Sequence, residues 1–465
     1  MALGTAIKLG AWLRPSRGSS PPGFDAHHAP DPALINTCVH CGFCLPACPT
    51  YVLWGQEADS PRGRIHLMRM ASEDQAALTP TWVHHFDTCL GCMSCMTACP
   101  SGVDYGKLIE ATRAQIERRH PRSMAERLHR WLIFSLFPDP RRLHWLRPLL
   151  AGYQRSGLQL ALRKSGALGL LPARLASLDA LMPELRRRSV TPALTAAVGT
   201  KRRRVGLLLG CVQREFLSDV NAATARVLAA EGCEVVAPDD QPCCGALLVH
   251  AGEESATLDL ARRMIETFER AEVDVIISNA GGCGSNLKEY GHLLRDDPAY
   301  ADRARRFAAK CRDVTELLGD LVPQATRHAL PLRVAYHDSC HLQHAQGVRT
   351  QPRALLGAVP GLTLVEVPES AICCGSAGIY NLVQPATADE LGDRKAAHVA
   401  PLAVDVVATG NPGCILQLRA ALARAGQDTP VLHTVQLLDA SMRAWRLGSS
   451  SSNRPKVRDS TQGTD

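Results

Sequence analysis

Two copies of one cysteine motif lie within the first hundred residues of this 465-residue chain. Each copy has the spacing Cys-x2-Cys-x2-Cys-x3-Cys-Pro; the first contains Cys38, Cys41, Cys44 and Cys48, and the second contains Cys89, Cys92, Cys95 and Cys99. Three thiolates this close together can bind three corners of one metal cluster, while the proline holds the fourth away from it. One copy could be an accident or a zinc knuckle, but two identical copies predict a pair of clusters.

The spacing is typical of paired [4Fe-4S] clusters, in which the fourth cysteine of each motif ligates the other cluster. Crossed ligation assigns one cluster to Cys38, Cys41, Cys44 and Cys99, and the other to Cys89, Cys92, Cys95 and Cys48. A structural zinc site usually has two Cys-x-x-Cys halves or a mixture of Cys and His, and disulfides are rare in a reducing compartment. We therefore predict two [4Fe-4S] clusters and a chain that carries electrons.

Eight further cysteines form a second repeat. Its order is a single cysteine after an apolar run, a vicinal pair followed by glycine, and a glycine-rich turn that ends in cysteine. The first copy contains Cys211, Cys243, Cys244 and Cys283, and the second contains Cys340, Cys373, Cys374 and Cys414. This repeat predicts two similar modules. Cys233 and Cys311 lie outside the pattern, and we expect them to be ordinary buried side chains.

Short aliphatic runs alternate with helical segments in both modules. The runs cover residues 205–209, 234–238 and 273–278, then 333–337, 362–368 and 404–409, and the main helices are expected at 219–230, 253–270 and 386–397. Continuous apolar strands predict parallel sheets covered by helices on both faces. Ligands of such sheets bind beyond the carboxyl ends of the strands, so the four thiols of each module should meet there. Iron–sulfur ligation, another metal such as zinc, a redox-active disulfide and simple burial remain open for these thiols.

The fold class expected is α+β multidomain, with a helical two-[4Fe-4S] ferredoxin-type domain followed by two α/β Cys-Cys-Gly modules with parallel sheets. The expected segments are a disordered N-terminal arm (1–32), the ferredoxin-type domain (33–116), a basic helical linker (117–204), the first module (205–325), the second module (326–442) and a disordered C-terminal tail (443–465). No apolar stretch approaches the roughly 20 residues that a membrane-spanning helix needs.

Positive charge is concentrated around the linker. Between Ala111 and Arg204, 20 Lys or Arg residues face five acids, a net charge of +15 in a chain whose formal net charge is +7. The segment is either a solvated linker or a docking face for an acidic partner protein or an anionic membrane surface. No nucleic-acid recognition motif accompanies it, so we expect no nucleic-acid partner.

Several longer stretches resemble the iron–sulfur subunit of bacterial glycolate oxidase (glycolate dehydrogenase). They are DSPRGR at Asp59–Arg64, CPSGV at Cys99–Val103, and QPRALLGAVPGL and CCGSAGIYN in the second module, within a resemblance from Asn36 to about Leu438. Subunits of anaerobic glycerol-3-phosphate dehydrogenase and of heterodisulfide reductase share this layout. Where Cys-Cys-Gly domains have a full cysteine set, the last motif is Cys-x-x-Cys. Here Ala280 and Asn411 occupy the first of those positions, so each module has four thiols.

The resemblance implies an electron-transfer subunit without catalytic residues of its own. The chain has no G-x-G-x-x-G fingerprint for a nucleotide cofactor, and removing hydride from a 2-hydroxy acid needs a two-electron acceptor. An FAD-binding dehydrogenase subunit would therefore oxidise the substrate, and this chain would carry electrons from that FAD to a quinone or another acceptor. We expect a cytoplasmic protein, with peripheral contact at the inner face of the cell membrane as a further option.

Two other classes of function remain open at this stage. One is a thiol or heterodisulfide reductase, or the iron–sulfur subunit of a lactate or glycerol-3-phosphate dehydrogenase; the other is a zinc-stapled scaffold. Polar residues around Cys340, namely His337, Asp338, His341 and His344, are expected to cap a helix or face solvent, with metal ligation or proton transfer as the alternative. Arg62 and Arg64 could stabilise anionic clusters or form ordinary ion pairs.

Overall fold

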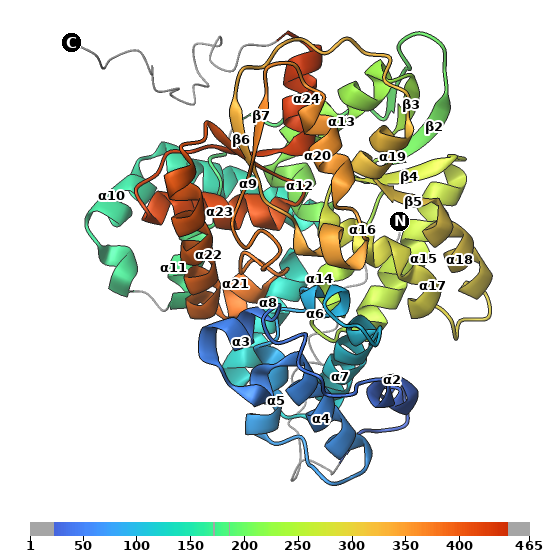
Figure 1. The fold of residues 1–465 in the computed structure, drawn as a ribbon, viewed down its shortest axis with the longest axis vertical. Coiled ribbons are helices and arrows are strands. Elements are labelled where there is room, and N and C mark those ends of the chain that lie inside the picture. Colours follow the sequence, from blue (N-terminus) through green and yellow to red (C-terminus); the bar gives the residue numbers. More distant parts are fainter. Residues whose placement is uncertain (1–22, 171–172, 186, 445–465) are drawn as a thin grey trace.

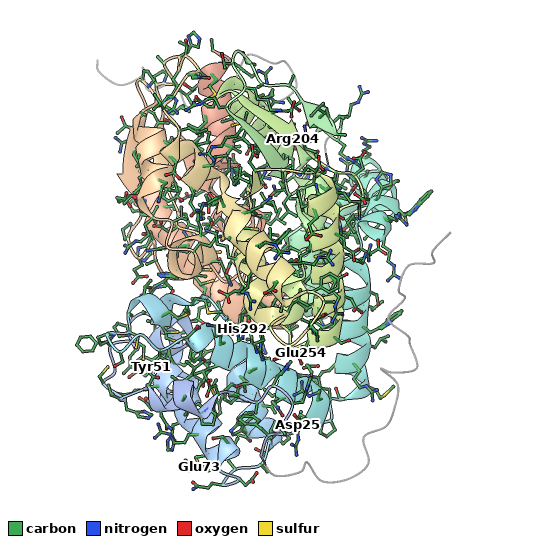
Figure 2. The ribbon with its side chains drawn as sticks, turned by 90° about the vertical axis from the view of Figure 1, so that its right-hand side faces the viewer. Asp25, Tyr51, Glu73, Arg204, Glu254 and His292 are labelled. Atoms are coloured by element: carbon green, nitrogen blue, oxygen red, sulfur yellow. The ribbon has the colours of Figure 1, made fainter. Side chains whose placement is uncertain are left out.

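The computed structural model describes residues 23–170, 173–185 and 187–444. Most of the expected N-terminal arm and C-terminal tail lies outside these residues. The described end of the arm contacts the folded chain, because the Asp25 carboxylate accepts hydrogen bonds from Gln115 and Arg118. Arg118 also pairs with Glu254 of the first module and so links it to Asp25; Asp25 and Glu254 are labelled in Figure 2.

The N-terminal domain is helical and occupies one end of the molecule, blue in Figure 1. Its elements are α2 (Pro32–Asn36), α3 (Pro49–Trp54), the 3-10 turn η1 (Glu57–Asp59), α4 (Pro61–Ser72), α5 (Pro80–Asp87), α6 (Ser94–Thr97) and α7 (Tyr105–Arg119). Proline opens α3, α4 and α5, where a missing N–H costs nothing. The core around Met68, Phe86 and Leu108 packs directly against several motif cysteines.

The linker forms short helices, as expected from its apolar spacing. They are α8 (Met124–Leu136), α9 (Pro140–Arg155), α10 (Leu158–Lys164), the 3-10 turn η2 (Ala167–Leu170) and α11 (Ala173–Ala180). Ser123 and Glu126 form a capping box that begins α8. Helix α9 contacts the first module at α12, and α11 contacts the second at α21 and α22. Among the described residues, no helix is both long and apolar enough to cross a bilayer.

The first module contains a mainly parallel sheet. Its elements are β2 (Arg203–Leu207), α12 (Cys211–Phe216), α13 (Ser218–Ala230), β3 (Cys233–Val236), α14 (Ala246–Val249), α15 (Glu254–Arg270), β4 (Val275–Ser278), α16 (Gly281–Lys288), α17 (Tyr290–Leu293), α18 (Ala301–Lys310), β5 (Cys311–Asp313) and α19 (Val314–Asp320). The strand order is β1-β3-β2-β4-β5. Strand β1 (Leu194–Thr195) comes from the linker and pairs antiparallel with β3.

The second module repeats this topology. It contains β6 (Arg333–Tyr336), the π-helical turn η3 (His341–Ala345), α20 (Thr350–Gly357), β7 (Thr363–Glu366), α21 (Tyr380–Val383), α22 (Pro385–Val399), η4 (Ala400–Leu402), β8 (Val406–Thr409), α23 (Pro412–Arg424), β9 (Val431–His433) and α24 (Thr434–Met442). The order β7-β6-β8-β9 matches β3-β2-β4-β5, and all pairs are parallel. The predicted mixed fold class with two repeated parallel-sheet modules is confirmed.

The two modules pack against each other through one apolar core and the turns that follow equivalent strands. Core side chains from both sheets, such as Val205 and Val406, belong to a single buried cluster. The Gly281 amide after β4 donates to the Gly410 carbonyl after β8 at 3.0 Å. Because these turns are part of the cysteine repeat, the strand ends that precede Cys283 and Cys414 lie near the interface between the modules.

Candidate iron–sulfur and thiol sites

The eight cysteines of the N-terminal motifs line two neighbouring cavities. One cavity is bordered by Cys38, Cys41, Cys44 and Cys99, and the other is bordered by Cys48, Cys89, Cys92 and Cys95; Cys95 also touches the first. This grouping has the crossed pattern predicted from the spacing. Four sulfur donors around each cavity are the ligand set that a [4Fe-4S] cluster needs, so the residues present fit that group.

The two cavities differ in their access to solvent. Cys41 is exposed, and the apolar side chains beside it, Val39 and Phe43, are 67% and 66% exposed. The second cavity is lined by buried cysteines, namely Cys48, Cys89, Cys92 and Cys95. We call the cavity bordered by Cys41 the outer cavity and the one lined by the four buried cysteines the inner cavity. The outer cavity lies at the protein surface, and the inner one lies toward the modules.

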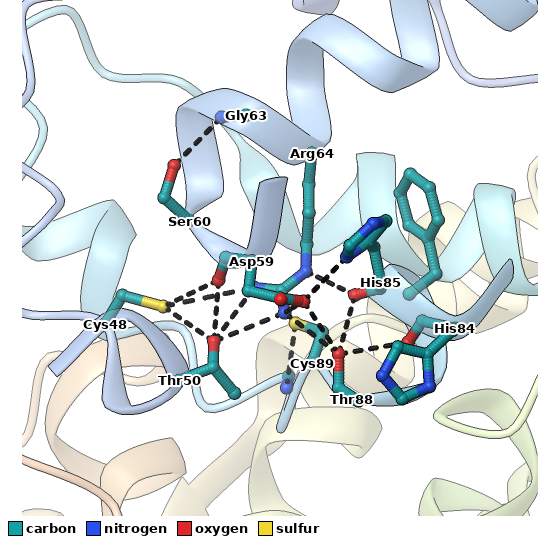
Figure 3. Close-up of polar contacts among 12 residues, drawn as sticks. Cys48, Thr50, Asp59, Ser60, Gly63, Arg64, His84, His85, Thr88 and Cys89 are labelled. Atoms are coloured by element: carbon teal, nitrogen blue, oxygen red, sulfur yellow. Dashed lines mark hydrogen bonds and ion pairs between the residues drawn. The ribbon is translucent and has the colours of Figure 1, made fainter. Parts of the chain in front are cut away.

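A buried arginine lies beside the inner cavity. The Arg64 side chain is 1% exposed, and its Nη1 approaches the Cys48 sulfur at 3.9 Å. Its other donors reach the Asp59 carboxylate at 3.3 Å and the Thr88 hydroxyl at 3.3 Å (Figure 3). Although burial raises the pKa of Cys89, the charges of Arg64 and Arg113 lower it below the usual thiol value. Arg64 therefore places fixed positive charge where anionic sulfur would collect.

The DSPRGR stretch builds this arginine site residue by residue. Asp59 accepts a hydrogen bond from Thr88 at 3.1 Å, and Ser60 caps α4 by accepting from the Gly63 amide at 3.0 Å. A Cβ on Gly63 would lie 1.9 Å from the Glu57 carbonyl oxygen, so only glycine lets α4 pass so close to η1. Sequence reasoning left the role of Arg64 open; the structure places it among the inner-cavity residues.

The module cysteines lie at the carboxyl ends of the strands, as predicted. In the first module, Cys211 follows β2 and Cys283 follows β4, the strand pair at which the strand order reverses. The Cys211 and Cys243 sulfurs are 3.4 Å apart, and Cys244 interacts with Cys283. The four thiols of this module therefore converge. Hydrogen bonding to Cys243, together with burial, raises the pKa of Cys211 well above its usual value.

The second module brings its thiols together in the same way, but their electrostatics differ. The Cys340 and Cys373 sulfurs are 4.0 Å apart. Hydrogen bonds from Cys340 and Cys374 lower the pKa of Cys373 well below its usual value. Hydrogen bonding from Cys374, assisted by His337, lowers the pKa of Cys414 to about 5. The lowered pKa values of Cys373 and Cys414 favour the thiolate form, which is the form that binds metal.

Glycine after each vicinal pair makes these sites geometrically feasible. Gly245 and Gly375 adopt φ values of 84° and 91°, in the left-handed region. A Cβ on Gly375 would lie 2.5 Å from the carbonyl oxygen of Ala388 on α22. The pair can therefore turn sharply against the helix. Cys233 and Cys311, expected to be ordinary buried residues, are 0% and 1% exposed on β3 and β5.

The polar residues around Cys340 do not behave as the sequence interpretation held. His337 and His341 are 2% and 7% exposed and no side chain caps the turn η3, so the interpretation of solvent-facing or capping side chains is wrong for both. Asp338 instead forms an ion pair with Arg353 at 2.7 Å. His344 contacts the N-terminal domain through Thr97 at 2.5 Å. The only sequence signal for this difference was that the matching stretch of the first module has no histidine.

The inner cavity and the second module share an apolar interface. Cys92, Cys340 and Cys373 belong to one buried cluster with Tyr380. The Tyr380 hydroxyl donates to the Thr88 carbonyl at 3.0 Å, across the same interface. The thiols of the second module therefore lie next to those of the inner cavity.

Comparison with known proteins agrees with this architecture. Family models match residues 34–103 (4Fe-4S dicluster domain), residues 125–182 (glycolate oxidase iron-sulfur subunit, linker region), and residues 205–288 and 334–419 (cysteine-rich domain). The probable glycolate oxidase iron-sulfur subunit of Bacillus subtilis is 40% identical over 418 residues, which cover 88% of this chain and 94% of that protein. The chain belongs to the family of glycolate oxidase iron–sulfur subunits.

Two further relatives match the chain over different lengths. The glycolate oxidase iron-sulfur subunit of Escherichia coli is 34% identical over 88% of this chain and 95% of its own length. Lactate utilization protein A of Bacillus licheniformis is 33% identical over 238 residues, 51% of this chain and 99% of that protein. As a member of the family, the chain is an oxidoreductase subunit that carries iron–sulfur clusters.

Proposed function

We propose that this chain is the electron-transfer subunit of a glycolate dehydrogenase. The observation that carries the proposal is the pair of thiol-lined cavities, in a chain similar over nearly its whole length to glycolate oxidase iron-sulfur subunits. The cluster in the outer cavity would be held by Cys38, Cys41, Cys44 and Cys99, and the cluster in the inner cavity by Cys48, Cys89, Cys92 and Cys95. Iron–sulfur groups held there supply one-electron transfer, and no residue of this chain acts on the substrate.

The two-electron step belongs to a partner in this proposal. Glycolate gives up two electrons together, so an FAD on a separate dehydrogenase subunit accepts them and releases them singly. The outer cavity, flanked by exposed Val39 and Phe43, is the natural site of contact with that subunit. A quinone or another carrier accepts the electrons at the end. The isolated chain should bind no flavin and should not oxidise glycolate.

Reconstitution tests the division of labour. The chain is purified anaerobically, alone and with its co-purifying subunits, and glycolate-dependent reduction of an artificial acceptor is measured. Activity should require an FAD-binding subunit. Cys92→Ala should remove about four of the about eight iron atoms of two cubanes and should lower activity strongly. Flavin-free glycolate oxidation by the chain alone, or full iron content in Cys92→Ala, contradicts the proposal.

A thiol or heterodisulfide reductase remains the second candidate, favoured by the convergence of four thiols in each module. Burial argues against it, because Cys243 and Cys374 are 0% and 1% exposed, and a disulfide substrate must reach a thiolate. Disulfide turnover without a flavoprotein would select this candidate.

The linker surface supports peripheral contact with a membrane. Met124, Leu128 and Leu132 form an exposed stripe along α8, and Trp145 and Leu149 are 79% and 72% exposed on α9. Apolar side chains on a strongly basic segment are the features of a helix that binds an anionic bilayer surface. Trp145→Ser with Leu149→Ser should reduce sedimentation with anionic vesicles, whereas Val322→Ser, an exposed residue elsewhere, should not. Equal binding by both variants contradicts the contact.

A further inference from the structure

A large cavity lies between the linker and the first module. Its volume is about 950 Å³, and it shares no lining residue with the two thiol-lined cavities. The end of α7, the helix α8 and the start of α9 border it on one side; α12, the loop after β3, α14 and α15 border it on the other. A cavity of this size can hold a small organic ligand or the polar part of a larger one.

Arginine dominates the wall of this cavity. Nine arginines line it against seven acidic residues, and five of those acids are already paired with arginine. Glu117, for example, pairs with both Arg122 and Arg130. Glu253 forms no ion pair with any described residue, but burial, assisted by Glu117, raises the pKa of its carboxyl to about 8. At neutral pH most of this carboxyl is therefore protonated and does not repel an anion.

Three of the arginines lack an acidic partner, and they come from three different elements. Arg141 on α9, Arg214 on α12 and Arg263 on α15 form no ion pair within the described part of the chain. Arg214 is half-buried; its Nη1 donates to the Asp239 carbonyl at 3.2 Å, and its Nε has no hydrogen-bond partner. Burial lowers the pKa of Arg214, because its charge is partly removed from water. An anion in the cavity would supply the missing counter-charge.

Exposed apolar side chains continue from these cations along the linker helices. On α9, Arg141, Trp145 and Leu149 are spaced four residues apart and so share one face of the helix. Trp145 and Leu149 are 79% and 72% exposed. On α8, Leu132 is 52% exposed and lies three residues before Ser135, which lines the cavity. The cavity therefore combines unpaired cations in its wall with apolar side chains that lead away from it.

This arrangement fits a phospholipid better than an acidic protein segment. A guanidinium group binds phosphate oxygens through two parallel hydrogen bonds, and acyl chains need apolar surface next to that phosphate. An acidic protein segment would also pair with the arginines, but it gives no reason for apolar side chains to follow them along two helices.

We propose that this cavity binds the phosphate headgroup of an anionic phospholipid such as phosphatidylglycerol, with Arg141, Arg214 and Arg263 as the groups that pair with the phosphate. The acyl chains extend along the exposed faces of α8 and α9 toward the bilayer. The inference deepens the membrane contact proposed above, and rests on it, by naming the lipid class and its site. The outer cavity, which has no lining residue in common with this site, stays free for the dehydrogenase subunit.

The test measures lipid binding by the full chain purified anaerobically. Dihexanoyl phosphatidylglycerol, kept below its micelle concentration, is the soluble probe and is followed by titration calorimetry. Phosphatidylcholine vesicles, with and without phosphatidylglycerol, are the membrane probe and are followed by sedimentation. Arg141→Gln with Arg263→Gln should weaken binding of the soluble lipid and of the anionic vesicles about tenfold or more. Iron content and thermal unfolding should stay unchanged, because both side chains are exposed and unpaired in the described chain.

The control removes the same charge elsewhere on the first module. Arg306→Gln with Arg312→Gln changes two exposed arginines that do not line the cavity, and it should leave binding of the soluble lipid unchanged. Equal weakening by the cavity variant and this control overturns the inference, since net charge alone would then explain binding. Unchanged lipid binding in the cavity variant overturns it too.

Two further measurements separate the possible occupants and the two proposals. Trp145→Ser with Leu149→Ser should lose vesicle binding but keep the soluble lipid, because the headgroup site is intact. Unchanged vesicle binding in that variant contradicts the apolar membrane contact, whereas its retained binding of the soluble lipid supports the headgroup site. Equal affinity for inorganic phosphate and the soluble lipid would assign the cavity to a free anion. Loss of dehydrogenase-subunit binding in the cavity variant, with lipid binding unchanged, would assign it to an acidic partner; either result overturns the inference.

Discussion

The guanidinium of Arg64 lies 3.9 Å from the sulfur of Cys48, fully enclosed by the N-terminal domain. Its partner carboxylate, Asp59, is also held by Thr88 and by His85, at 3.1 and 3.0 Å. A buried charge is tolerated only where its donors are satisfied, and this network satisfies them. The positive charge of Arg64 is thus fixed beside the inner cavity and not at the protein surface.

Replacing Arg64 should affect both the fold and the inner cluster. Arg64→Leu leaves Asp59 buried without its cation, which should cost about 3–5 kcal/mol of unfolding free energy. The midpoint potential of the inner cluster should fall, because removing a nearby positive charge destabilises the reduced form, which is the more negative one. Thermal unfolding and a redox titration followed by EPR provide the measurements. Arg62→Leu, which removes an exposed pair with Glu57, is the control; equal effects of the two variants would refute this role for Arg64.

Gly63 should tolerate no side chain. In Gly63→Ala the new Cβ would lie 1.9 Å from a backbone oxygen of η1, so α4 must shift away from Asp59 and the inner cavity. We expect a clear drop in melting temperature together with loss of iron. Gly152→Ala is the matched control, because a Cβ at that position of α9 meets nothing within 4 Å. There alanine should stabilise the helix by up to about 1 kcal/mol. Equal stability of the two variants would contradict the argument.

Glu253 should make stability depend on pH. Burial, assisted by Glu117, raises the pKa of this carboxyl from 4.5 to about 8. The folded state therefore holds a proton that the unfolded state releases, and the stability it contributes is complete below about pH 4.5 and lost as pH rises through about 8. Glu253→Gln should reduce this loss of unfolding free energy by about 1–3 kcal/mol.

Thermal unfolding at pH 5.5, 7 and 8.5 checks this expectation. The change Glu73→Gln at an exposed carboxyl (Figure 2) provides the control and should leave the pH profile as in the unmodified chain. Parallel profiles for Glu253→Gln and the unmodified chain would show that Glu253 is ionised in the folded state.

Phe43 should contribute to the contact with the electron-donating partner. Phe43 is 66% exposed beside the outer-cavity cysteines, and a large apolar side chain in that position is typical of an interface anchor. Phe43→Ser should weaken binding of the partner subunit about tenfold or more, while iron content stays unchanged. Titration calorimetry or coupled acceptor reduction measures the change, with Val322→Ser as the control. Unaltered binding would place the partner elsewhere on the chain.

Local spacing in the sequence predicted much of this molecule. The two motif copies specified which cysteines would surround each cavity, because a short loop limits which thiols can approach one another. Aliphatic runs predicted β2, β3, β4, β6, β7 and β8, because each of these strands overlaps a short run of aliphatic residues. Strands β1, β5 and β9 were missed, because two or three residues, as in Cys311–Asp313, carry no periodic signal and form a strand only by pairing with β3, β4 or β8.

Only the tertiary structure decided what surrounds the sulfur atoms. The sequence by itself determined the two motifs, the repeated modules and their strand-end thiols, since each depends on residues close together in the chain. It did not determine that Cys92 adjoins the second module rather than the first, or that His337 is buried beside Cys414. Those relationships join segments about 280 and 77 residues apart, and they depend on how whole sheets and helices pack, which no local pattern encodes.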